Sequence, residues 1–148
     1  MDIAKRYNEN YFNWYKKIGE FGAIFNKNKF SPYIKKSDVV LDFGCGGGYL
    51  LNNIECAEKY GLEINEVAIE EANKKFKIYK KTSDLPENKF DVIISNQVLQ
   101  HCENPRLELL SLYKSLKKNG KIVLCVLCAG PKLNYKKDDV NFQLYSSP

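Results

Sequence analysis

The chain has 148 residues, of which 44% are hydrophobic and 28% are charged, and its formal net charge is +5. These values are typical of one globular domain with a single core. No apolar run approaches the roughly 20 residues of a membrane-spanning helix, and the polar start MDIAKRYNEN lacks the apolar region of a signal peptide. We therefore expect one domain over residues 1–148, located in the cytoplasm and without a membrane partner.

The five cysteines form an odd set without a CxxC motif. The nearest pair, Cys125 and Cys128, lies in the apolar stretch KIVLCVLC, where a free cysteine behaves as a small hydrophobic residue. This pattern favours free thiols in a reducing compartment and predicts neither a disulfide nor a metal site.

Much of the positive charge lies in the lysine-rich residues 74–81. Such a cluster can belong to a nucleic-acid-binding face, or to a helix end and an edge strand whose lysines discourage sheet-to-sheet pairing. A charge of +5 is too modest to indicate an anionic partner. We favour the edge strand and expect no nucleic-acid partner.

In chain order, the first predicted element is a helical segment within residues 1–36. Aromatic and aliphatic residues recur there at spacings of three, four and one, which is typical of a helix face. Gly19 and Gly22 weaken its middle, so one helix and two shorter helices are both compatible with the pattern. We call these residues the aromatic stripe: Tyr7, Tyr11, Trp14, Tyr15, Ile18, Phe21, Ile24 and Phe25.

Residues 37–128 alternate between strand and helix patterns. The predicted elements are strand 38–42, helix 49–56, strand 59–64, helix 66–75, strand 76–80, strand 90–95, helix 105–118 and strand 121–127. This rhythm predicts an α/β, doubly wound, mostly parallel sheet with helices on both faces. The polar residues 129–148 are predicted to be an irregular tail.

The stretch VVLDFGCGGGYLL carries four glycines directly after the first predicted strand. Ligands of doubly wound sheets bind beyond the carboxyl ends of the strands. Glycines there permit positive φ angles and let a ligand touch the backbone, and the helix that follows favours an anionic group. The sequence therefore predicts a nucleotide-like ligand with an anionic end.

Two common nucleotide motifs do not match. The third glycine of the dinucleotide fingerprint GxGxxG is replaced by Tyr49, and no Gly-Lys-Ser/Thr follows as in a phosphate-binding P-loop. The pattern present is Gly44-x-Gly46-x-Gly48. An acid, Glu63, follows Gly44 by 19 residues at the end of the second predicted strand, where a carboxylate can accept hydrogen bonds from ribose hydroxyls.

Four segments together resemble the class I S-adenosylmethionine-dependent methyltransferases. They are LDFGCGGG, YGLEIN, KTSDLPENKFDVIISNQVLQHCENP and LKKNGKIVL. The resemblance implies a Rossmann-like sheet with strand order 3-2-1-4-5, S-adenosylmethionine as cofactor, and methyl transfer to a small-molecule acceptor such as a sugar or lipid metabolite. The absence of N-P-P-Y after the fourth strand sets the chain apart from adenine and glutamine N-methyltransferases.

The resemblance also implies a cofactor site, residue by residue. Asp42 and the backbone of Gly44 and Gly46 hold the methionine end, with Cys45 as a small residue that fits the loop. The remaining positions are Glu63 for the ribose, Ile64 and Leu85 for the adenine ring, Asp84 for the adenine amino group, and Asn96 and Gln97 for the sulfonium side. The family's histidine corresponds to His101, which either acts as a general base or packs the following helix.

Two further questions stay open at this point. In similar enzymes an amino-terminal helix covers the cofactor, so the aromatic residues near the start of the chain either form such a lid or belong to a plain core face. These residues are Tyr7, Tyr11, Phe12, Trp14 and Tyr15. Members of the family usually continue past the fifth strand, so we expect a chain truncated there, without the last two strands. An exposed fifth strand then predicts a homodimer through that edge. The alternative function is a truncated or degenerate fold that binds the cofactor or a partner without turnover.

Overall fold

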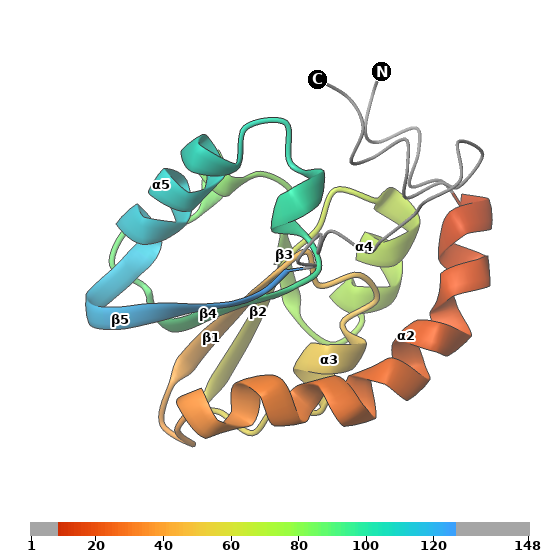
Figure 1. Ribbon diagram of the computed structural model, residues 1–148, viewed down its shortest axis with the longest axis horizontal. Coiled ribbons are helices and arrows are strands. Elements are labelled where there is room, and N and C mark those ends of the chain that lie inside the picture. Colours follow the sequence, from red (N-terminus) through yellow and green to blue (C-terminus); the bar gives the residue numbers. More distant parts are fainter. Residues whose placement is uncertain (1–8, 127–148) are drawn as a thin grey trace, which may run out of the picture.

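The structure is a computed structural model that describes the backbone of residues 9–126 and the side chains of residues 16–126 (Figure 1). Five strands form one parallel sheet in the order β3-β2-β1-β4-β5, which confirms the predicted fold. The strands are β1 (Val39–Phe43), β2 (Glu58–Leu62), β3 (Lys77–Tyr79), β4 (Phe90–Asn96) and β5 (Leu116–Cys125). The helices are α2 (Glu9–Phe30), α3 (Tyr49–Asn52), α4 (Glu66–Asn73) and α5 (Pro105–Ser115), with short 3₁₀ turns η1 (Ser31–Tyr33), η2 (Thr82–Asp84) and η3 (Leu99–His101).

The hydrophobic core lies on both faces of β1 and β4. Every residue of β1 is buried. Alternate residues of a strand point to opposite faces of the sheet, and helices cover both faces at β1 and β4. On one face α2 and α3 cover a cluster that includes Phe30, Val40 and Leu51; on the other, α5 contributes Leu112 against Leu41 (Figure 1). This two-sided burial holds the carboxyl ends of β1 and β4 side by side.

The described part of the amino-terminal segment is one helix, α2, and Ala23 and Phe30 lie on its inner side. Ala23 is 3% exposed and Phe30 is fully buried against the core. The members of the aromatic stripe with described side chains, Ile18, Phe21, Ile24 and Phe25, all lie on the exposed side. The residues for which lid and core face are the alternatives lie outside the described side chains: Tyr7, Tyr11, Phe12, Trp14 and Tyr15. Both interpretations of those residues stay predictions.

The junction of α5 and β5 differs from the prediction. The helix ends at Ser115 instead of residue 118, and β5 begins at Leu116 instead of residue 121. Leu116 is buried and pairs with Phe90, and the register then shifts before Lys121 pairs with Val92. Burial of Leu116 on the sheet therefore overrides the helical pattern, and the residues between the two pairs form an irregularity in the strand.

The carboxylate of Asp91 stabilises the irregular part of β5. The Asp91 carboxylate accepts a hydrogen bond from the Val39 amide at 2.8 Å and from Lys117 Nζ at 2.7 Å. These contacts join the start of β1 to β4 and β5, and the lysine keeps the pKa of Asp91 below its usual value despite partial burial.

The lysine-rich residues 74–81 lie at and beside β3, the edge strand opposite β5. Lys74 pairs with Glu71 at 2.7 Å, and Lys80 pairs with Glu66 at 2.8 Å. Part of this positive charge is thus neutralised by α4. That pairing agrees with the edge-strand interpretation. The tail at residues 129–148 lies outside the described residues.

Candidate cofactor site

The glycine-rich loop after β1 adopts a backbone that only glycine takes easily. Gly44, Gly46 and Gly48 have φ angles of 77°, 53° and 77°, all in the left-handed region. A Cβ added at Gly44 would collide with the side chain of Val98. The loop is therefore pressed against the segment that follows β4, and Gly44 is needed for that close approach.

Gly46 has a different environment. A Cβ added there would meet no atom within 4 Å, so this glycine opens onto space and not onto packed side chains. The peptide at this point is accessible to a ligand that approaches within van der Waals distance of the backbone. We call the space over Gly46, between the ends of β1 and β2, the glycine cradle.

Glu63 closes one side of the glycine cradle. Its Oε2 accepts a hydrogen bond from the Gly46 amide at 2.8 Å, and its Oε1 accepts from the amides of Ile64 at 2.8 Å and Asn65 at 3.0 Å. The Glu63 amide donates to the Tyr79 carbonyl of β3 at 3.0 Å. The side chain is thus aimed at the loop by backbone on both sides, as expected for a residue that meets a ligand held there.

Asp42 lies beneath the same loop and is only 2% exposed. Burial, and next the nearby negative charge of Glu63, raise its pKa to about 7. Among the described residues no hydrogen bond to this carboxylate is recorded. A buried carboxylate without a donor is costly, and a cationic ligand would relieve that cost.

Cys45 fills the space between the loop and β2. The thiol is buried and donates to the Gly46 carbonyl at 3.5 Å. Burial raises its pKa well above the usual value, and Asp42 and Glu63 add to the effect. Cys45 therefore stays protonated, which suits the predicted role of a small residue that fits the loop.

The first three backbone amides of the loop already donate hydrogen bonds within the fold. The amides of Gly44 and Cys45 both donate to the Leu62 carbonyl, at 2.8 and 3.1 Å. Since the Gly46 amide donates to Glu63, a ligand that takes a hydrogen bond from it must share or replace the carboxylate. The sequence assigned the backbone of Gly44 to the methionine end of the cofactor, and in the structure the amide of that backbone already donates within the fold.

The end of β4 brings two more predicted residues to this edge of the sheet. The Asn96 Oδ1 atom is buried and has no hydrogen-bond partner among the described residues. Gln97 has a φ of 63°, and its amide donates to the Cys125 carbonyl of β5 at 2.7 Å. The Gln97 Oε1 atom accepts from Gln100 Nε2 at 2.9 Å. This bond links the strand end to η3.

His101 ends η3 and is half-buried. Its amide donates to the Val98 carbonyl at 2.8 Å, so the residue is tied to the segment that touches Gly44. Burial lowers the pKa of the imidazole below 6.5. At neutral pH the ring is therefore uncharged and able to accept a proton.

The remaining predicted residues are less closely joined to the loop. Ile64 is 43% exposed next to Glu63. Asp84 is exposed at the end of η2, where it accepts from Ser83 Oγ at 3.2 Å, and Leu85 packs on the core beneath α5. The described contacts bring together residues 42–46 and 63–65, with Val98 pressed on the loop, but none links Asp84 to that group.

Sequence reasoning missed two residues that shape the loop. Val98 excludes any side chain at position 44, and the ring of Tyr49 lies where a side chain of residue 47 would be, with Cζ 2.6 Å from an added Cβ. The Tyr49 hydroxyl is buried without a hydrogen-bond partner among the described residues, and burial raises its pKa to about 12. The sequence did carry a signal for each residue: Val98 is an apolar residue just past β4, and Tyr49 is an aromatic residue just past the glycines.

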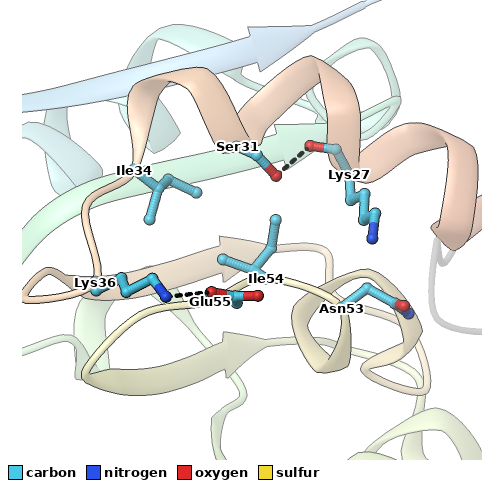
Figure 2. A pocket seen from close by; sticks show the side chains of 7 residues that line it. All are labelled: Lys27, Ser31, Ile34, Lys36, Asn53, Ile54 and Glu55. Atoms are coloured by element: carbon cyan, nitrogen blue, oxygen red, sulfur yellow. Dashed lines mark hydrogen bonds and ion pairs between the residues drawn. The ribbon is translucent and has the colours of Figure 1, made fainter.

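A hollow of about 230 Å³ lies near the amino ends of β1 and β2, away from the glycine cradle (Figure 2). Ile34, Ile54 and polar and charged side chains line it, and Lys36 pairs with Glu55 along one rim at 3.1 Å (Figure 2). Both members of that pair are highly exposed, so the hollow is a surface feature and not part of the candidate site. Within residues 9–126 no cluster of possible metal ligands occurs, and no helix there is long and apolar enough to cross a membrane.

The sequence and the fold were compared with those of known proteins. A family model described as a methyltransferase domain matches residues 21–145. The chain belongs to this family. The match spans the glycine loop, both carboxylates and the end of β4, and S-adenosylmethionine is the cofactor that the comparisons support.

Relatives of this methyltransferase domain are similar over only part of their length. A ubiquinone biosynthesis O-methyltransferase of Rickettsia bellii is 28% identical over 137 residues, which cover 78% of this chain and 57% of the relative. The chain thus spans little more than half the length of the curated relatives that it matches.

Two solved structures show the same fold. A SAM-dependent methyltransferase from Archaeoglobus fulgidus is 30% identical, with a TM-score of 0.63 over 76% of this chain and 56% of that one. The complex between the Haloferax volcanii Trm112 methyltransferase activator and the putative methyltransferase gives a TM-score of 0.66 at 17% identity, over 84% of this chain and 60% of that one.

Proposed function

We propose that this domain is an S-adenosylmethionine-dependent methyltransferase that acts on a small-molecule acceptor. The observation that carries the proposal is the glycine cradle, where Gly46 opens onto space beside two carboxylates at the ends of β1 and β2. The cofactor carries an ammonium and a sulfonium, so the buried Asp42 gains a cationic neighbour when the site is filled. A dinucleotide or a phosphate would meet two acids there instead.

The residues present fit this cofactor. Asp42 and the loop backbone would hold its methionine end, and Glu63 its ribose. Asn96, whose buried Oδ1 lacks a partner in the described structure, would turn the partial negative charge of that oxygen toward the sulfonium. Ile64, Asp84, Leu85 and Gln97 remain proposed contacts of the adenine and the sulfonium side.

When bound, S-adenosylmethionine supplies an activated methyl group, which moves to the acceptor by in-line displacement. The protein's part is to hold the acceptor in line and to exclude water, which can contribute roughly 7–11 kcal/mol to the lowering of the barrier. A hydroxyl acceptor also has to lose a proton. The neutral imidazole of His101 is the group that we propose for this step, since burial keeps it unprotonated at pH 7.

The names of the Rickettsia relatives support a hydroxyl acceptor, since those proteins are O-methyltransferases of ubiquinone biosynthesis. We propose a hydroxyl group of a small metabolite, with sugar and lipid metabolites both included. The free thiols of the described cysteines support the proposal of a reducing, cytoplasmic location.

The decisive experiment is a calorimetric titration of S-adenosylhomocysteine into the wild type and into the Asp42→Ala and Glu63→Ala variants. We expect saturable binding to the wild type and at least a tenfold loss of affinity in each variant. An Asp38→Ala variant is a matched control, because that acid lies at the other end of β1. Failure of the folded wild type to bind would refute the proposal and favour a degenerate domain.

A further inference from the structure

We propose that the outer face of α2 binds the surface of an anionic lipid bilayer. We define this outer face as Ile18, Phe21, Ile24 and Phe25. The inference rests on the helix alone and is independent of the proposed methyl transfer. A helix that lies in a membrane surface needs no membrane-spanning run, so the inference is compatible with the absence of such a run in the described residues.

The outer face is large, apolar and exposed. The exposed fractions of its side chains are 49% for Ile18, 71% for Phe21, 51% for Ile24 and 66% for Phe25. The spacing of three and four residues places all four on one side of the helix, and the rings of Phe21 and Phe25 lie 6.2 Å apart. Figure 1 shows α2 along the outside of the molecule, with α3 and α4 on its inner side.

The orientation of α2 is set by its other side. Ala23 and Phe30 are buried against β1 and α3. Rotating the helix to bury Phe21 and Phe25 would expose Phe30 and leave bulky rings where Ala23 now fits. The outer face is therefore held outward by packing.

The charges around the outer face favour an anionic partner. Residues 16–30 contain four lysines and one glutamate. Lys16 pairs with Glu71 of α4 at 3.6 Å, and the half-buried Lys27 lines the hollow near Ile34. The lysines that border the outer face are therefore Lys17 and Lys29, the latter with its Nζ 3.7 Å from Cys125 Sγ. Lys17 is exposed immediately beside Ile18, and Lys29 is exposed one turn beyond Phe25. Apolar side chains bordered by lysines are the pattern of an interfacial amphipathic helix.

A second copy of the chain is a poorer occupant. The exposed parts of four such side chains amount to roughly 450 Å², whereas a stable interface buries about 800 Å² on each partner. Two outer faces in contact would also oppose their lysine borders, and like charges across an interface are unfavourable. A bilayer requires no such interface area, because shallow insertion needs only the apolar side chains. It also brings no like charges together, because anionic headgroups neutralise the lysines.

The test is co-sedimentation with vesicles of phosphatidylcholine alone and with 30% phosphatidylglycerol. We expect the wild type to bind only the anionic vesicles, and binding to fall when salt is raised from about 50 to 500 mM. The variant Phe21→Ser/Phe25→Ser is expected to lose at least tenfold in partition. The matched control is Leu107→Ser/Tyr113→Ser on α5, whose side chains are 58% and 71% exposed and whose partition should stay unchanged.

Both variants should keep the wild-type circular dichroism and the wild-type affinity for S-adenosylhomocysteine, which separates this test from that of the proposed function. The inference is overturned if the folded wild type ignores anionic vesicles, or if the α5 control loses as much partition as the α2 variant. It is also overturned if light scattering shows a wild-type dimer that the Phe21→Ser/Phe25→Ser variant dissociates, because the occupant is then a second copy.

Discussion

Asp42 and Glu63 place two carboxylates at the ends of neighbouring strands, and only Glu63 is held by recorded hydrogen bonds. Glu63 shares its charge with three backbone amides. Asp42 is buried, and within the described part of the chain no donor to its carboxylate is recorded. Its raised pKa expresses the cost of burying the charge and, next, the repulsion from Glu63. The ionised form of Asp42 is therefore destabilised, and a bound cation would stabilise it.

The Asp42→Asn variant should be more stable than the wild type at high pH. The folded-state pKa of about 7 lies above the unfolded value of 3.8, so the wild type loses stability as pH rises between these values and is level beyond them. We expect the gain from Asp42→Asn to be about 3 kcal/mol larger at pH 8 than at pH 4.5, measured by urea denaturation. A gain that does not depend on pH would contradict this reading of Asp42.

His101 gives a prediction on activity. If it is the base, His101→Gln should lower kcat by roughly 10²–10⁴ with little change in affinity for S-adenosylhomocysteine. Because burial lowers the imidazole pKa, the acidic limb of the wild-type pH profile should lie below 6.5 and disappear in the variant. A variant with full activity would assign His101 to the packing of η3.

At the scale of elements, two glycines within three residues of the same loop have different roles: one is needed for the fold and the other is proposed to be needed for ligand binding. Gly44 is required by the fold, because Val98 occupies the space of its Cβ, while Gly46 is free of contacts at that atom. The same residue type thus serves two purposes, and substitution should distinguish them.

We expect Gly46→Ala to cost only about 1–2 kcal/mol of stability, from the left-handed backbone, and yet to abolish binding of S-adenosylhomocysteine. Gly44→Ala carries the same backbone penalty and also the collision with Val98, so its loss of stability should be larger by roughly 1–3 kcal/mol. Thermal unfolding and calorimetric titration of both variants measure the two effects. Full binding by Gly46→Ala would show that no ligand approaches the backbone there.

For the whole molecule, the sheet ends in two different edges. The short β3 is bordered by lysines, whereas β5 exposes Leu124 at 38%. The exposed Lys118 and Lys121 lie earlier in β5, so any edge-to-edge pairing would use its carboxyl half. A homodimer through β5 remains our proposal for the assembly.

The assembly is tested by light scattering on the wild type and on Leu124→Lys. We expect a dimer that the charged substitution converts to a monomer, since a lysine on the edge opposes pairing. The matched substitution Ile64→Lys, at another exposed aliphatic residue, should leave the mass unchanged. A monodisperse wild-type monomer would end the proposal.

The local pattern of the chain was sufficient for the parallel sheet, the glycine loop and the place of α4, whereas the strand order was implied by the family resemblance. In the structure Asn65 caps α4, with Oδ1 accepting from the amides of Val67 and Ala68. These features depend on neighbours within a few residues, and on alternation rules that hold for any parallel sheet. The same is true of Glu63, whose place at the end of β2 follows from the strand pattern alone.

The tertiary structure decided which face of α2 is buried, where α5 ends and how Asp42 ionises. Helical spacing shows that Ile18, Phe21, Ile24 and Phe25 share a face but not which way the face points, and here Ala23 and Phe30 occupy the core instead. Leu116 joins β5 because its burial on the sheet outweighs local helix preference. The pKa of Asp42 depends on burial and on Glu63, which is 21 residues away in the chain. Orientation, burial and charge coupling are properties of contacts between distant segments, and only the folded chain creates them.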